Sequence, residues 1–205
     1  MPVDTHSFAL SNILQVGDVV FIRVHARAFR EVSIATGSWT NHVGIVVAKN
    51  GNDISVAEST FPLSRTTSFE SFVARSEQGK IAITRLQTPL TSAQQRSLVD
   101  AARRRCGIFY DTGFNLHSKG QFCSRFVREV LAEATGENVG DVESFADLLA
   151  RRPSAALGFW RLWYFGRIPW TRETVTPASL LCCHKMKLVF EGSLRPKHDA
   201  SKEWA

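Results

Sequence analysis

The sequence lacks a long apolar run, a paired-cysteine motif and an internal repeat. No stretch approaches the roughly 18 uninterrupted apolar residues that a membrane span needs, which argues against an integral membrane protein. Its four cysteines, at positions 106, 123, 182 and 183, contain no Cys-x-x-Cys pair. We therefore expect no regular disulfide framework, no metal site and no cofactor. Each cysteine must either pack in the core or act as a reactive thiol.

The first residues also lack the basic and apolar regions of a secretory signal, so we expect a cytoplasmic protein with reduced thiols. The 205 residues are 44% hydrophobic and 21% charged, which is typical of a soluble globular chain. Its length predicts a single domain over residues 1–193, followed by a polar, flexible tail at 194–205. The 25 basic and 19 acidic residues give a net charge of +6, which favours anionic partners but fixes no function.

The first half of the chain carries the signals of β-strands. Asn50–Asp53 is a strong reversal signal between two apolar runs, which predicts a hairpin with His42 and Glu58 at its open end. Residues 26–41 are polar and mixed, and we interpret them as a loop. Strands are expected at residues 19–22, 43–48, 54–57 and 81–86.

Helical signals dominate the second half. Thr91 and Gln94 match a capping box at the start of a helix that runs to about residue 105. A second helix begins near Gln121, carries an apolar stripe and ends at Gly136, and a short third one covers residues 144–150. Its stripe consists of Cys123, Phe126, Val127, Val130, Leu131 and Ala134. Strands followed by helices indicate an α+β fold, with an antiparallel sheet packed against helices.

Residues 151–175 form an aromatic and basic insertion or cover. Aromatic rings and arginines crowd this segment, and no acid occurs between Arg151 and Arg172. The favoured interpretation is a cover whose rings pack against the core. A second interpretation is a peripheral contact with an anionic membrane through Trp160, Trp163 and Phe165. A last strand region is expected within residues 180–190.

Three side chains are candidates for chemistry. Cys123 begins a helix, where free backbone N–H groups and the positive end of the dipole favour a thiolate. His42 stands where a polar loop enters a strand and could accept the thiol proton. Glu58 could orient the imidazole, with Ser59 and Thr60 as substitutes if the hairpin register differs. Each also has a purely structural interpretation, and bases at His25 or His117 remain alternatives if the fold differs.

Taken together, these residues resemble a known family. The motifs that carry the resemblance are Gly17–Phe21, His42–Val46, Ala57-Glu58, Gly107–Asp111 with Phe114, and Phe122–Val127. In this order they are similar to the circularly permuted branch of the NlpC/P60 superfamily of papain-like cysteine hydrolases, especially its YiiX/YebB-like group. The resemblance covers residues 14–135, and a weaker match continues at 176–181. It implies a permuted papain-like fold with the nucleophile at a helix N-terminus.

The resemblance also implies roles for individual residues. Cys123 would be the nucleophile, His42 the base and Glu58 the orienting residue, while Tyr110 and Asp111 would lie near the cleft and bind substrate. Arg125 departs from the family, whose cysteine motif often carries an acid at this position. The segment after residue 150 is unusual as well, so substrate specificity does not carry over.

We therefore expect a cysteine-dependent hydrolase, an amidase, peptidase or esterase, that works through an acyl-enzyme. Its substrate would be a small acyl, peptide or lipid-like molecule. Three alternatives remain: an acyltransferase that acts on lipid-like substrates, a non-catalytic ligand-binding module and a nucleic-acid-binding module. The last is disfavoured because Arg103–Arg105 end a helix, where cations are favourable anyway, and because no nucleic-acid motif occurs.

Overall fold

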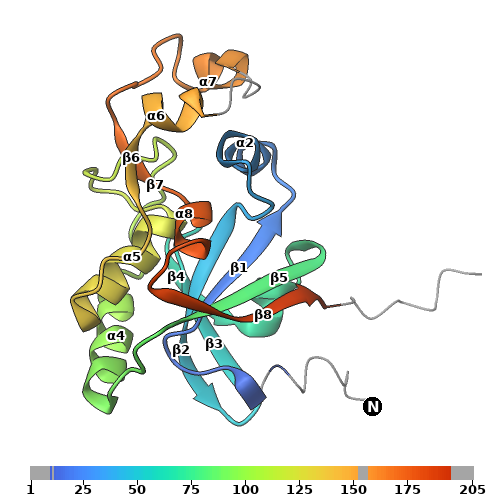
Figure 1. Ribbon diagram of the computed structural model, residues 1–205, viewed down its shortest axis with the longest axis vertical. Helices are drawn as coiled ribbons and strands as arrows, with labels where there is room; N and C mark the ends of the chain where they lie inside the picture. Colours follow the sequence, from blue (N-terminus) through green and yellow to red (C-terminus); the bar gives the residue numbers. More distant parts are fainter. Residues whose placement is uncertain (1–9, 11, 152–156, 195–205) are drawn as a thin grey trace, which may run out of the picture.

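The computed structural model describes residues 10, 12–151 and 157–194. Its centre is a six-stranded antiparallel sheet with the strand order β4-β3-β2-β1-β5-β8 (Figure 1). The strands are β1 (Val19–Val24), β2 (His42–Asn50), β3 (Asp53–Glu58), β4 (Arg65–Ser68), β5 (Ser76–Leu86) and β8 (Met186–Ser193). Together with the helices, this sheet confirms the predicted α+β class, an antiparallel sheet packed against helices.

The helices occupy both faces and one end of the sheet. They are α2 (Arg27–Thr36), α3 (Phe69–Val73), α4 (Ser92–Arg104), α5 (Cys123–Thr135), α6 (Phe145–Ala150), α7 (Leu157–Trp163) and α8 (Pro177–Leu181). Figure 1 shows α4 and α5 side by side on one face, with α6 and α7 at one end of the long axis. A short pair of strands, β6 (Val142–Ser144) and β7 (Glu173–Val175), connects the α6–α7 region to the rest. None of the described helices has the length and apolar character needed to cross a bilayer.

An apolar cluster packs against each face of the sheet. On one face, side chains from β1 and β2 pack against the buried stripe of α5, including Phe126, Val130 and Leu131. On the other face, the core includes Phe69 and Phe72 from α3. Both faces of the sheet are apolar because successive side chains of the apolar strands point to opposite faces, and the apolar residues of α5 recur with helical spacing.

The predicted hairpin and helices are confirmed. β2 and β3 turn back at residues 51–52, α4 carries the full Thr91–Gln94 capping box, and α5 ends at Gly136 in the left-handed conformation. Ser144 caps α6, as its position before an apolar segment suggests.

Other expectations need correction. Residues 26–41 are not a loop, because α2 occupies residues 27–36 and ends at Gly37 with a φ of 63°. The expected strand region at 180–190 begins as the end of α8, and β8 starts only at Met186. The strand expected at 81–86 begins earlier, at Ser76. The tail predicted at 194–205 lies outside the described residues apart from Leu194, and the single-domain boundary stays a prediction.

Gly44 in β2 gives a test of the packing behind His42. A Cβ at this position would lie 2.6 Å from Val56 Cγ1 and 2.9 Å from Phe72 Cε2. We expect Gly44→Ala to lower the free energy of unfolding by about 1–3 kcal/mol, because the buried sheet cannot make room. Gly158→Ala is the matched control: its Cβ would meet nothing within 4 Å and Ala favours a helix over Gly, so this change should not lower the stability. Urea unfolding measures both, and equal effects would contradict the packing argument.

Candidate active site

The fold brings the three predicted chemical residues together beneath the start of α5. His42 is the first residue of β2, Glu58 is the last residue of β3, and Cys123 is the first residue of α5. His42 and Glu58 are fully buried, and Cys123 is buried to within a few per cent. The site therefore lies between the end of the sheet and the N-terminus of the helix, as the resemblance implied.

Glu58 holds one side of the imidazole. Its Oε2 lies 2.6 Å from His42 Nε2 and 2.7 Å from the guanidinium of Arg75. Its Oε1 accepts a hydrogen bond of 3.2 Å from Arg65. Burial alone would raise the pKa of Glu58, but His42 and Arg75 outweigh it and lower the pKa to about 2. The carboxylate is therefore ionised at neutral pH and can fix the orientation of the ring.

On its other side, the His42 imidazole interacts with the Cys123 sulfur. Burial by itself lowers the pKa of His42, but Cys123 and Glu58 raise it from 6.5 to about 9. With Nε2 bonded to Glu58, Nδ1 is the nitrogen left for the thiol, and Nδ1 is buried without a conventional hydrogen bond among the described residues. The arrangement favours an imidazolium beside the sulfur at neutral pH.

Two aromatic rings contact the His42 imidazole and hold it in place. Phe72 stacks on His42 with ring centroids 5.6 Å apart, and Phe29 from α2 meets it edge-on at 5.8 Å. The guanidinium carbon of Arg75 lies 5.0 Å above the Phe72 ring, so the group that binds Glu58 also covers the stacking ring. Gly44 leaves the room that Phe72 occupies.

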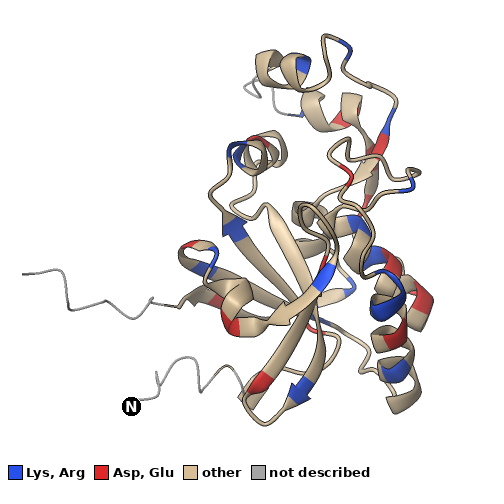
Figure 2. Cartoon of the chain, turned by 180° about the vertical axis from the view of Figure 1, so that it is seen from behind, with Lys and Arg blue, Asp and Glu red and all other residues tan. Residues whose placement is uncertain are grey.

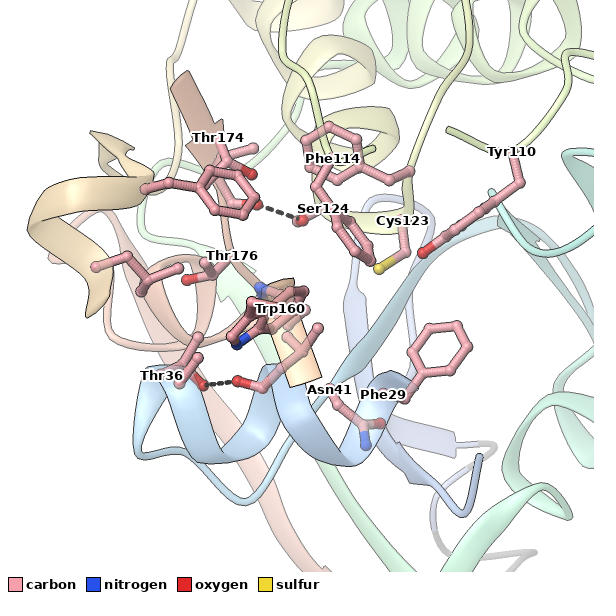
Figure 3. Close-up of a pocket in the computed structure, with 17 residues that line it drawn as sticks. Phe29, Thr36, Asn41, Tyr110, Phe114, Cys123, Ser124, Trp160, Thr174 and Thr176 are labelled. Atoms are coloured by element: carbon pink, nitrogen blue, oxygen red, sulfur yellow. Dashed lines mark hydrogen bonds between the residues drawn. The ribbon is translucent and has the colours of Figure 1, made fainter. Parts of the chain in front are cut away.

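Tyr110 points its hydroxyl toward the sulfur of Cys123 (Figure 3). The oxygen is buried and has no hydrogen-bond partner among the described residues. Burial raises the pKa of Tyr110 well above 10, and the nearby Cys123 and Asp111 raise it further, so the group remains a proton donor. An unpartnered buried hydroxyl is costly unless something binds it.

Asp111 contributes to the shape of the loop. Its carboxylate accepts hydrogen bonds from Gly113 N, Asn115 N and the Ser118 hydroxyl, at 2.7–2.9 Å. It is not one of the residues that line the cavity beside Cys123. A direct contact of Asp111 with substrate therefore stays a prediction.

Arg125, which departs from the related motif, fastens the same loop to α5. It donates to the carbonyls of Ser118 and Gly120 at 2.8 Å and pairs with Glu129 at 2.6 Å. Its side chain thereby stabilises the loop that precedes Cys123.

A small apolar cavity of about 30 Å³ adjoins the sulfur. Side chains of α2, α6, α7 and the segment before α8 close around it (Figure 3), and none of the described residues that line it is charged. The lining includes Phe29, Val32, Ala35, Tyr110, Phe114, Cys123, Phe145, Leu148, Trp160 and Val175. A groove of about 210 Å³ shares Phe29, Tyr110 and Phe114 with this cavity and is likewise uncharged.

The interpretation of residues 26–41 as a loop missed α2, whose side chains line one side of the cavity. Phe29, Val32 and Thr36 recur at helical spacing, and Gly37 follows as a stop signal, so periodicity could have identified this helix. The arginines that hold Glu58 carried no comparable signal. They come from β4 and from the residue after α3's cap, neither of which the sequence pattern indicated.

In the described part of the aromatic segment, residues 157–175, Trp160 points inward. Its exposed fraction is 4%, so the interpretation of Trp160 as a membrane-contact residue is wrong. Trp160 packs edge-on against Phe114 and Phe145 and thereby closes the cavity. Trp163 is half-buried, stacks on Phe159 and donates its indole N–H to the carbonyl of Thr112.

The alternative histidines lie elsewhere. His25 contacts Arg30 at the surface, and His117 pairs with Glu173 at 2.6 Å in an exposed position. Neither lines the cavity beside Cys123.

Comparison with known proteins places these features in a family. Residues 13–190 match the model of the family described as permuted papain-like amidase enzyme, YaeF/YiiX, C92 family. The uncharacterized protein YiiX of Escherichia coli K12 is 26% identical over 166 residues, 81% of each chain. A crystal structure titled metalloprotein yiiX, from E. coli O157:H7, superposes with a TM-score of 0.80 at 25% identity, covering 89% of this chain and 98% of that one.

The buried ion pair predicts a pH window for stability. The raised pKa of His42 contributes stability that is complete below 6.5 and lost as pH rises through about 9. The lowered pKa of Glu58 contributes stability that is complete above 4.5 and lost as pH falls through about 2. We expect Glu58→Gln to cost about 3 kcal/mol between pH 4.5 and 6.5, and less on either side. Urea unfolding across pH measures this, and a difference independent of pH would contradict the pairing.

Proposed function

The chain belongs to the permuted papain-like amidase family, and from this premise we propose that it cleaves an amide or ester bond through an acyl-enzyme on Cys123. The observation that carries the proposal is the buried His42 ring, held between Glu58 and the sulfur that begins α5. A nucleophile, a proton carrier and an orienting carboxylate in this order are the parts that a thiol hydrolase needs.

The reaction begins with the proton already on His42. The Cys123 thiolate attacks the carbonyl carbon, and the tetrahedral intermediate collapses to a thioester as the imidazolium protonates the departing amine or alcohol. A water molecule then gives its proton to the neutral ring and attacks the thioester. The acid leaves, and the thiolate–imidazolium pair is restored. Glu58 stays ionised throughout and stabilises the charged ring.

Two donors are available for the oxyanion. Cys123 is the first residue of α5, so its backbone N–H has no partner within the helix and can bind an oxygen at the helix start. The Tyr110 hydroxyl points to the same place from the opposite loop (Figure 3). One such donor typically contributes about 3 kcal/mol to the transition state. An oxyanion would also give the unpartnered Tyr110 hydroxyl its hydrogen bond.

A metal does not fit this site. The solved relative is titled a metalloprotein. In the part of this chain that the structure describes, no three His, Cys, Asp or Glu side chains gather into a group that could hold an ion. His42 is already bonded to Glu58, which in turn binds Arg75. The proposed reaction therefore uses the protein's own side chains.

The nucleic-acid alternative loses its main support. Within the run Arg103–Arg105, Arg104 pairs with Glu133, and Arg105 pairs with both Glu129 and Glu133. Phosphate binding would need these cations to be free. These ion pairs instead join the end of α4 to α5.

The cavity favours an uncharged, apolar acyl group. The cavity beside the sulfur is lined mainly by aromatic and aliphatic side chains, with uncharged polar ones among them, and a charged group placed there would lose its hydration without an ion partner. This argues for a simple or lipid-like acyl group over an acidic peptide. The same acyl-enzyme could pass its acyl group to an alcohol or amine, so acyl transfer differs from hydrolysis only in the acceptor.

A thiol-directed acylating probe tests the nucleophile. We expect wild-type protein to form one covalent adduct, detected by intact mass, and Cys123→Ala to form none. The matched controls are Cys106→Ala, Cys182→Ala and Cys183→Ala, which should all be labelled as the wild type is. Unchanged labelling of Cys123→Ala would overturn the proposal.

A panel of p-nitrophenyl esters tests the acyl group. We expect butyryl esters to acylate the enzyme at least about tenfold faster than succinyl esters, because the lining residues offer no charge to a carboxylate. Ala35→Val should slow butyryl esters more than acetyl esters, since Ala35 lines the cavity and the added methyl groups reduce its volume. A preference for succinyl esters would contradict the apolar pocket.

A further inference from the structure

The outer side of α7 and the turn after it expose apolar side chains that the protein leaves uncovered. Leu162 is 78% exposed and Phe165 is 96% exposed, whereas Trp160 on the same helix is buried. The cover therefore has two sides, one that closes the cavity and one that faces solvent. We call the outward side, formed by Arg161, Leu162, Phe165 and Arg167, the outer tip.

The backbone holds Phe165 outward. Its φ of 50° lies in the left-handed region, which is unfavourable for a bulky residue. The turn is fixed by hydrogen bonds from Gly166 N to Arg161 O and from Arg167 N to Tyr164 O, at 2.6 and 3.0 Å. Strained backbone of this kind persists where the surrounding structure enforces it, and it concentrates at functional sites. Here the strain is not offset by burial of the ring.

Charge at the outer tip has one sign. The sequence contains no acid between Asp147 and Glu173. Arg161 and Arg167 are exposed, and neither takes part in the ion pairs found among the described residues. Figure 2 shows the arginines of α7 and the following loop at the outer end of the molecule. Two apolar side chains thus stand beside two unpaired cations.

We propose that the outer tip docks on an anionic membrane surface. Leu162 and Phe165 insert at the boundary between headgroups and acyl chains, while Arg161 and Arg167 bind lipid phosphates. An aliphatic side chain such as Leu162 has no stacking role in a nucleic-acid complex, and phosphate binding alone would not require Phe165 to be exposed. The combination of protruding apolar tips and adjacent arginines fits an anionic lipid surface.

The position of the outer tip gives the docking a consequence. Trp160 lines the cavity beside the sulfur, and Trp163 lines the neighbouring groove, so the inner side of the same segment forms the wall of the site. Docking would place the groove close to the lipid. The docking itself does not depend on catalysis, because the outer tip contains none of the residues that we assign to the reaction.

Vesicle sedimentation tests the proposal with the full chain. We expect binding to vesicles of phosphatidylcholine mixed with phosphatidylglycerol, and at least tenfold weaker binding to phosphatidylcholine alone. Leu162→Ser with Phe165→Ser should reduce partitioning at least tenfold, and Arg161→Gln with Arg167→Gln should remove the dependence on anionic lipid and on salt. Leu188→Ser is the matched control: this side chain is also exposed, but it lies on β8, and binding should not change.

The outcomes separate docking from chemistry. Cys123→Ala should bind vesicles as the wild type does, and Leu162→Ser with Phe165→Ser should still form the acyl-enzyme with a soluble ester. Full binding by the Leu162→Ser, Phe165→Ser protein would overturn the proposal. So would equal binding to neutral and anionic vesicles, or binding of single-stranded RNA by a wild type that ignores vesicles.

Discussion

The hydrogen bond between His42 and Glu58 is the interaction on which the site depends. Both groups are withdrawn from water, and each carries a charge that burial opposes. Neither could remain ionised there alone, because an unpaired buried charge is costly. Arg75 and Arg65 complete the neutralisation of the carboxylate, so the imidazole is left to interact with the sulfur. The electrostatics of the site are therefore a property of four side chains from three strands and a connecting segment.

The geometry of that pair rests on an irregularity in the sheet. The register between β2 and β3 shifts by one residue between Val46 and Ala48. On the His42 side of the shift, Ile45 pairs with Ala57. The next pair in this register is Gly44 with Glu58, which puts the Glu58 side chain on the same face of the sheet as His42. Without the shift Glu58 would stand opposite Ile45 and point to the other face, because successive side chains alternate. Gly44 then admits Phe72, whose ring stacks on His42.

The cover joins the two functions that we assign to the molecule. One side of the α7 segment closes an apolar cavity over the sulfur, and the other presents Leu162 and Phe165 between unpaired arginines. Trp160 is buried within α7, whereas Phe165 is exposed in the left-handed turn that follows the helix. A hydrolase with an apolar acyl cavity and a lipid-facing cover would take its substrate directly from a membrane.

Local sequence patterns determined the parts of this protein whose signals are local. The Asn50–Asp53 reversal, the Thr91–Gln94 box and the stripe that begins at Cys123 each specify an element through residues that are neighbours in the chain. The order of the motifs was sufficient to indicate the family. Tertiary structure alone decided that a bulge turns Glu58 toward His42, that Arg75 neutralises it and that Trp160 faces inward while Phe165 faces outward. These outcomes depend on contacts between residues distant in sequence, and no periodicity records which way such side chains turn.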